Sequence, residues 1–118
     1  MENIKFYRRL YVNTPEMIIF EDYGDLHEAE KNNYTYVVCK DIKKVEKNDN
    51  EIKISLSDNH FCAVDFNTGL ILIRHKTKKD CIKYVEENCE RLIISGKNFQ
   101  KRYSTINTYA KSSGKYEK

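Results

Sequence analysis

Apolar and aromatic residues in the first two-thirds of the chain occur in short runs separated by turn residues, a pattern typical of β-structure. Residues 6–12, 17–20 and 34–39 are rich in aromatic and β-branched side chains, which favour strands. An Asn-Thr-Pro sequence at 13–15 indicates a turn, and the second run is expected to end near Gly24. Three strands are therefore predicted here.

A short helical segment is expected between the second and third of these strands. Asp25 offers a side-chain acceptor, and the acid Glu28 follows three residues later, which resembles a capping box. Asn32 and Asn33 come next, and asparagine tolerates turn conformations. The sequence therefore predicts one or two helical turns that end at these asparagines.

Residues 42–47 and 51–57 are predicted to form a β-hairpin. They flank an Asn-Asp-Asn turn at 48–50, and these residue types tolerate the left-handed backbone that tight turns require. Apolar residues occupy alternate positions in the second arm, so one face of that strand is expected to be buried and the other wet.

Residues 61–66 and 70–74 are predicted to form a second hairpin. The turn between them ends in Gly69, which adopts a positive φ without steric cost. Residues 70–73 are apolar at every position, so both faces of this strand should be covered. We therefore expect it to lie in the centre of the sheet.

The last third of the chain has a helical period. A second capping box at 77–80 precedes an apolar stripe over 81–93, with spacings of one, three and four residues. Gly96 is expected to end this long helix. Asn98 is expected to begin a second, shorter helix, and residues 112–118 have nothing apolar to bury apart from one tyrosine.

Runs of strands followed by runs of helix are typical of an α+β fold. We predict a single domain over residues 1–111, built on a mostly antiparallel sheet of five or six strands. The long C-terminal helix packs on this sheet, and the second, shorter terminal helix lies at an edge or extends away. Residues 112–118 are predicted to be a flexible polar tail. A chain of 118 residues suits one core.

Composition and cysteine usage favour a cytoplasmic protein. Hydrophobic residues make up 40% of the chain and charged residues 33%, as in folded globular proteins. The chain has no run of about 18 apolar residues for a membrane span and no apolar secretory segment at its N-terminus. The four cysteines are therefore expected to be free thiols. Heavy use of Lys, Asn, Ile and Tyr suits A/T-rich codons, which favours a phage or other mobile element as the source.

The net charge of +3 hides an asymmetry between the two parts of the chain. Residues 74–118 hold 12 of the 21 Lys and Arg and 5 of the 18 Asp and Glu, which leaves 9 basic against 13 acidic residues in 1–73. A polarised surface of this kind can steer a charged partner, although a lysine-rich solvated helix gives the same count.

Catalytic and cofactor motifs are missing from the sequence. It contains no GxGxxG, GxxxxGK[ST], HExxH or GxSxG motif, and no CxxC pair. The two pairs of adjacent acidic residues, at 21–22 and 86–87, diverge in a strand or a helix and do not resemble a general acid/base pair. We therefore expect no enzyme, no cofactor and no metal.

His60 and Cys62 are the best candidates in the sequence for a catalytic or metal-binding site. In a strand they share one face, and Asp58 precedes His60 by two residues. A thiol, an imidazole and a carboxylate form either a nucleophile set or half a metal site. The alternative is a buried Cys62 that acts as a small hydrophobe beside a turn histidine. We favour the buried cysteine, because the sequence shows no evident source for a third and fourth metal ligand. Whether His60 or Cys62 has a function stays open.

The first predicted strand carries the candidate binding surface. Tyr7, Arg9 and Tyr11 alternate on one face, which we expect to point outward, with Lys101 and Arg102 of the last helix as its basic margin. Aromatic rings and guanidinium groups are frequent at binding hot spots and stack on bases. Alternatively, the tyrosines lie across the sheet with wet hydroxyls and have only a structural role.

These observations favour a small non-enzymatic binding protein, an inhibitor or adaptor that occludes a host protein. An acidic segment between residues 16 and 30 would then mimic nucleic acid to a basic partner. One alternative is a nucleic-acid-binding module that uses the basic C-terminal helices for phosphate contacts. Another is a sponge or sensor that holds a nucleotide-like molecule between sheet and helix or across a homodimer.

Overall fold

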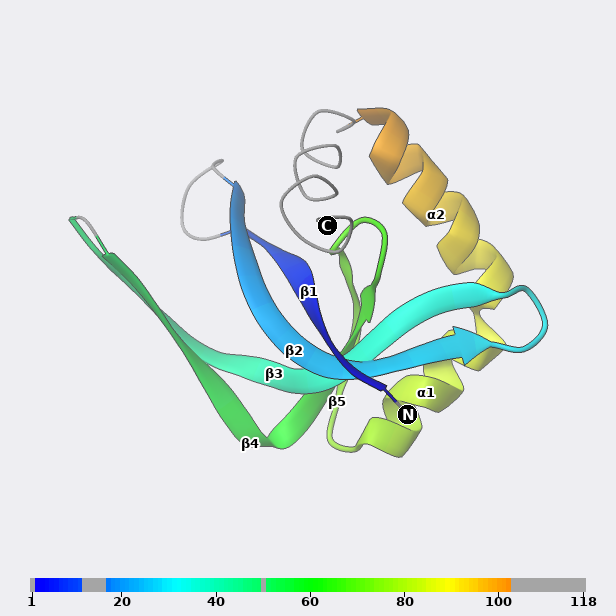
Figure 1. Cartoon of the computed structure of the whole chain (residues 1–118), viewed down its shortest axis with the longest axis horizontal. Helices are drawn as coiled ribbons and strands as arrows, with labels where there is room; N and C mark the ends of the chain where they lie inside the picture. The colour runs from blue at the N-terminus through cyan, green and yellow to red at the C-terminus, as the bar shows by residue number, and fades with distance from the viewer. Residues whose placement is uncertain (1, 12–16, 50, 103–118) are drawn as a thin grey trace.

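Five strands and two helices follow one another in the computed structural model, which describes residues 2–11, 17–49 and 51–102 (Figure 1). They are β1 (Glu2–Tyr11), β2 (Met17–Ala29), β3 (Tyr34–Asn48), β4 (Glu51–Asp65), β5 (Ile71–His75), α1 (Lys78–Glu87) and α2 (Cys89–Arg102). The strands form one antiparallel sheet in chain order, β1-β2-β3-β4-β5. The prediction of an α+β fold is confirmed.

Two of the strands are longer than the apolar runs that predicted them. β3 joins the two runs on either side of residues 40–41, and β4 joins the two on either side of residues 58–60. Register shifts lie between Lys40 and Ile42 and between Ile42 and Lys44. The polar residues at these positions therefore lie in an irregular strand that bends, because a bulge kinks a strand without ending it.

The predicted helical segment at 25–28 is wrong, because these residues belong to β2. β2 pairs with β1 over residues 17–26 and with β3 over residues 25–29. Gly24 lies at this change of partner, and a Cβ there would come within 2.6 Å of Cγ1 of Val37. Pairing with strands on both sides therefore outweighs the local capping preference, and glycine permits the close approach.

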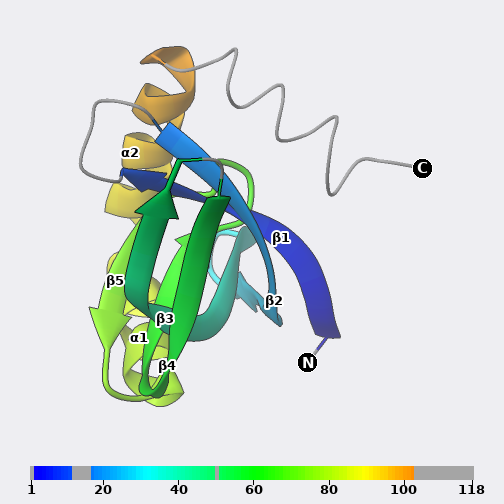
Figure 2. The same cartoon turned by 90° about the vertical axis from the view of Figure 1, so that its left-hand side faces the viewer.

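Apolar side chains pack on both faces of the curled sheet. The helix-side cluster joins the sheet to both helices and has as its buried members Ala29, Tyr34, Tyr36, Val38, Ala63, Cys81, Val85, Cys89 and Leu92. The inner cluster lies on the other face, where the sheet curls over itself (Figure 2), and consists of Phe6, Val37, Cys39, Cys62 and Val64. The stripe along the predicted long helix therefore does contribute to the core, as expected.

The prediction of one long helix that ends at Gly96 is wrong. The helix begins as predicted, since the Thr77 hydroxyl accepts a hydrogen bond from the Asp80 amide. It is interrupted at Asn88, whose backbone and side-chain N–H groups both donate to the carbonyl of Tyr84, at 3.0 and 2.8 Å. This local capping ends α1 and turns the chain into α2.

Gly96 lies inside α2 and is buried. A Cβ at this position would stand 3.2 Å from Oδ2 of Asp65, so the glycine permits a close approach between helix and sheet. The second predicted helix, from Asn98, is the end of α2 up to Arg102, and the rest of that prediction lies outside the described residues. Neither described helix has the length and apolar character needed to cross a membrane.

The prediction of a central position for residues 70–73 is wrong, because β5 is the last strand of the sheet and pairs with β4. Its apolar side chains nevertheless pack on both faces of the sheet. Ile71 packs on the inner cluster, and Leu72 and Ile73 pack on the helix-side cluster. The preceding turn is confirmed, with Gly69 at φ 76°.

The curl of the sheet brings this turn against β1. The Arg9 amide donates a 2.8 Å hydrogen bond to the carbonyl of Gly69, which joins two segments about 60 residues apart. A Cβ at Gly69 would lie 2.6 Å from the carbonyl oxygen of Tyr7, so the contact requires glycine. The two ends of the sheet therefore meet at this junction.

Candidate functional site

Residues 42–49 and 51–57 of the β3–β4 hairpin form an arm that projects from the rest of the molecule (Figure 1). Val45 lies opposite Ile54, and Lys47 lies opposite Ile52. Residues opposite each other in a ladder, and residues two apart in a strand, share a face. One face of the arm is therefore mainly apolar, and it is only partly covered, since Ile52 is exposed and Val45 and Ile54 are half-buried.

A groove of about 350 Å³ lies at the base of this apolar face. It is lined by Arg9 and Leu10 from the end of β1, by Ile42 and Val45 from the arm, and by Leu70, Ile71 and Arg74 at β5. None of these lining residues is acidic. The groove thus combines apolar walls with the largely exposed guanidinium of Arg74, which suits an occupant that is apolar and carries negative charge.

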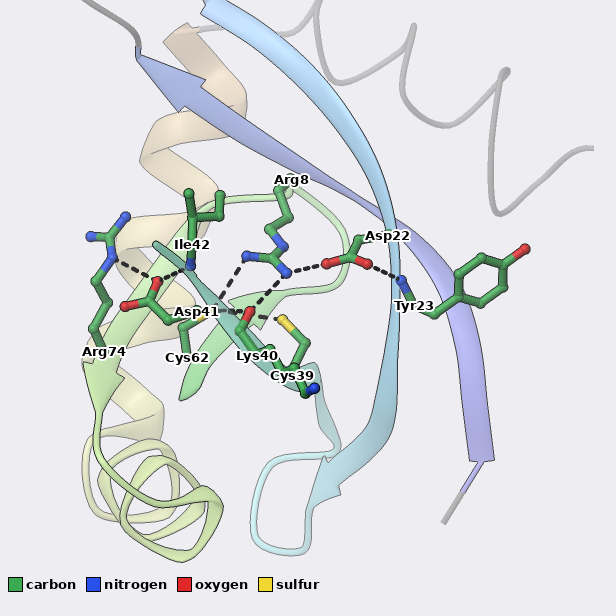
Figure 3. A network of polar contacts seen from close by, with 9 residues as sticks. All are labelled: Arg8, Asp22, Tyr23, Cys39, Lys40, Asp41, Ile42, Cys62 and Arg74. Carbon is green, nitrogen blue, oxygen red and sulfur yellow. Dashed lines mark hydrogen bonds and ion pairs between the residues drawn. The ribbon is translucent and has the colours of Figure 1, made fainter. Parts of the chain in front are cut away.

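Arg74 is fixed at the rim of the groove by Asp41 (Figure 3). Its Nε donates a 3.1 Å hydrogen bond to Oδ1 of Asp41, and the amide of Ile42 donates to the same oxygen at 2.7 Å. The side chain of Arg74 is largely exposed, whereas that of Asp41 is mostly buried. A guanidinium has five N–H donors, so one fixed contact orients the group and leaves other donors on the solvent side.

Arg9 is not on an exposed strand face, so this part of the predicted surface is wrong. Its relative exposure is 3%, its Nε donates to the carbonyl of Thr68, and its guanidinium lies 5.2 Å from the ring centre of Phe99. The turn before β5 and the end of α2 cover this part of β1. The contact with Phe99 places the end of α2 next to β1, which is where the basic margin of Lys101 and Arg102 was predicted.

The other residues of the predicted surface have mixed environments. Tyr7 is half-buried, and its hydroxyl donates a 3.1 Å hydrogen bond to Glu21 on β2. Lys101 is exposed, and the side chains of Tyr11 and Arg102 lie outside the described residues. A binding role for these residues stays a prediction.

Arg8 is the centre of a buried polar network that the sequence analysis missed (Figure 3). Its Nη2 donates to Asp22 of β2 and, at 2.9 Å, to the carbonyl of Lys40 of β3, and its Nη1 lies 3.7 Å from Sγ of Cys62. The guanidinium also lies within 6 Å of the rings of Phe6 and Phe20, at 5.7 and 5.6 Å. One signal was available, since alternation puts Arg8 on the same face as Phe6.

Cys62 and Cys39 are direct neighbours across the β3–β4 ladder, and both belong to the inner cluster. Their sulfur atoms lie 3.6 Å apart. The pKa of Cys62 lies below its usual value because Cys39 donates a hydrogen bond to its sulfur and because Arg8 is close, and these effects outweigh burial. The pKa of Cys39 is raised because its thiol is the donor and is buried. Of the two thiols, Cys62 is therefore the one that ionises more easily.

The set of Asp58, His60 and Cys62 is not assembled. The ring of His60 is exposed and contacts the side chain of Asn59 at 3.0 Å, whereas Cys62 is buried beside Arg8. Asp58 is exposed and pairs with Lys40 at 3.7 Å. Cys62 is therefore buried, as the second interpretation expected, but the side chain beside its sulfur is that of Arg8 and not that of a histidine.

A second hollow, of about 390 Å³, lies where α1 meets α2 and is lined by Lys31, Asn32, Glu86, Glu87, Asn88, Cys89, Glu90 and Arg91. Three carboxylates and two cations share this small surface, so it favours no single ligand charge. The groove is therefore the better candidate for binding. Comparison of the chain with protein-family models, curated proteins and solved structures finds no match.

Proposed function

We propose that this chain is a non-enzymatic binding protein that takes an extended segment of a partner protein into the groove. The observation that carries the proposal is the combination of apolar walls with the exposed guanidinium of Arg74, in a groove whose lining, within the described residues, includes no acidic side chain. A segment with apolar side chains flanked by Asp or Glu has complementary chemistry, because guanidinium groups bind carboxylates with good geometry.

The position of β5 supports strand addition as the mode of binding. β5 hydrogen-bonds to β4 on one side, and within the described residues it is the last strand of the sheet. Such an edge can pair with an added strand, whose main chain supplies affinity and whose alternate side chains enter pockets. Ile71 and Arg74 of β5 line the groove, so apolar side chains of an added segment would enter it while an acidic one reaches Arg74.

The arm favours a protein segment over a small molecule as the occupant. Its apolar face continues outward from the groove through Val45 and Ile54 to the exposed Ile52. A small molecule would leave this surface open, whereas a longer segment would cover it. A partner held in this way loses its own access to other proteins, so an inhibitor or adaptor that occludes a host protein is the biological role that we propose.

The proposal is tested by selecting binders from a display library of random 12-residue peptides on the immobilised chain. We expect enrichment of peptides that combine apolar residues with Asp or Glu. Val45→Asp should weaken their binding at least tenfold, and Arg74→Glu should act in the same direction. Ser55→Asp is the matched control, because Ser55 lies opposite Lys44 on the other face of the arm, and it should change binding less than twofold.

Two outcomes would contradict the proposal. Selected peptides that bind Val45→Asp as tightly as the unmodified chain would show that the groove is not the site. Selection without acidic enrichment, together with tight binding of single- or double-stranded oligonucleotides at about 50 mM salt, would favour the nucleic-acid alternative instead.

A further inference from the structure

The Cys39–Cys62 pair has the geometry that precedes a disulfide. The two residues are Cα partners in the antiparallel ladder, and residues directly opposite each other have Cα atoms about 4.5–5.5 Å apart. This range lies inside the window of about 4.4–6.8 Å in which a disulfide closes. The sulfurs are 3.6 Å apart and must approach by about 1.5 Å to reach the S–S bond length of about 2.05 Å.

A small pocket borders Cys39, one member of the pair. This residue lines a pocket of about 210 Å³ together with Asn3, Tyr23, Gly24, Leu56 and Phe61, among others. A water molecule occupies about 30 Å³ in the liquid, so the pocket has room for hydrogen peroxide. A Cβ at Gly24 would stand 2.9 Å from Cβ of Cys39, so glycine permits β2 to pack closely against Cys39 beside this pocket.

Polar groups around Cys62 can interact with both its thiolate and its thiol form. The guanidinium of Arg8 faces its sulfur at 3.7 Å, and the carbonyl of Lys40, at 3.9 Å, accepts a hydrogen bond when the sulfur is protonated. By contrast, burial raises the pKa of Cys81 to about 11. The remaining two thiols, Cys81 and Cys89, lie in the helix-side cluster, away from Arg8.

We propose that Cys39 and Cys62 form a reversible redox switch that a small hydroperoxide oxidises to a disulfide. The inference stands on the geometry of the pair and does not depend on the groove. In the first step the thiolate of Cys62 attacks one oxygen of hydrogen peroxide, the O–O bond breaks and hydroxide leaves. Cys62 becomes a sulfenic acid, and the hydroxide takes the proton of Cys39 and becomes water.

In the second step the deprotonated sulfur of Cys39 attacks the sulfur of Cys62, the S–S bond forms, and the sulfenic oxygen leaves as hydroxide. The two sulfurs lose two electrons in total, and the peroxide gains them. A dithiol reductant restores the thiols by exchange at the disulfide.

The test is a mass-spectrometric assay on the reduced full-length chain. The chain is treated with hydrogen peroxide, free thiols are blocked with iodoacetamide, and the product is digested with trypsin. Each cysteine then falls in a separate peptide, spanning 32–40, 54–74, 80–83 and 84–91. We expect a disulfide between peptides 32–40 and 54–74 that dithiothreitol removes, with the other two peptides alkylated.

Variants separate the proposed site from general thiol oxidation. In Cys39→Ser, dimedone should trap a sulfenic acid on Cys62, because no second thiol resolves it. In Cys62→Ser, oxidation of Cys39 should be at least tenfold slower, because the more easily ionised thiol is gone. The double variant Cys81→Ser/Cys89→Ser should form the disulfide at the unmodified rate. Circular dichroism of each variant verifies that it is folded.

Three results would overturn the inference. The first is a folded, peroxide-treated chain with no Cys39–Cys62 linkage. The second is a mixture of disulfide pairings that includes Cys81 or Cys89. The third is formation of the linkage at the same rate in urea-unfolded and in folded chain, since a preorganised pair should react at least tenfold faster when folded.

Discussion

Replacement of Asp22 by alanine should destabilise the fold far more than replacement of its neighbour Glu21. The Arg8 side chain has a relative exposure of 0% and that of Asp22 has 13%. Without Asp22, Arg8 stays buried with the carbonyl of Lys40 and the sulfur of Cys62 as its acceptors. A buried cation without its counter-charge is costly, because the surrounding protein solvates it poorly.

The magnitude follows from this environment. Breaking a buried ion pair from one side costs about 3–5 kcal/mol, and the two remaining acceptors place Asp22→Ala near the lower end. Glu21 forms its ion pair with Lys5 at the surface, at 3.3 Å and with exposures of 49% and 46%. Solvent screens such pairs, so Glu21→Ala should cost about 0–1 kcal/mol.

Urea unfolding followed by circular dichroism measures both values. With an m-value of about 1.5 kcal/mol/M, Asp22→Ala should lower the midpoint by about 2 M, and Glu21→Ala by less than about 0.7 M. If Asp22→Ala does not fold, Asp22→Asn retains an acceptor oxygen for Arg8 and gives the smaller loss. Equal, small losses for Asp22→Ala and Glu21→Ala would refute the reasoning that the buried pair dominates.

Two further predictions concern the helix-side cluster and its margin. Leu92→Ala should cost about 2–5 kcal/mol in urea unfolding because Leu92 is buried, whereas Ile94→Ala, at a 61% exposed position, should cost less than about 0.5 kcal/mol; equal losses would contradict the assignment of the core. Burial lowers the pKa of His27, so the unfolded chain takes up a proton first and the stability present above about pH 6.5 should be lost as the pH falls below it. His27→Phe preserves a ring against Tyr36, which His27 stacks on at 5.3 Å, and its melting temperature should fall less between pH 7 and 5.5; equal falls would exclude His27 as the cause.

Features encoded by neighbouring residues could be predicted from the sequence. Gly69 and the Asn-Asp-Asn turn at 48–50 marked both hairpins, because turn residues act locally. Thr77 marked the start of α1 for the same reason. Features that depend on distant contacts could not be predicted. Gly96, a helix stop by local rules, lies against Asp65 of β4.

The candidate sites show the same division. Alternation puts Arg8 on the apolar face of β1, but only the register of the sheet brings Asp22 and Lys40 to its guanidinium. The burial of Arg9 depends on a turn about 60 residues away. The pairing of Cys39 with Cys62 follows from a register that contains bulges, which no local pattern reveals.

The chain-order arrangement of the strands has a consequence for folding kinetics. Each strand pairs with its predecessor, and local contacts of this kind favour fast folding. The junction between Arg9 and Gly69 is different, because it closes a loop of about 60 residues, and the entropic cost of closure grows with loop length. We expect it to form after the hairpins and to open first in local unfolding, which hydrogen exchange detects at the Arg9 amide. Since Arg9 also lines the groove, binding there would slow exchange of this amide.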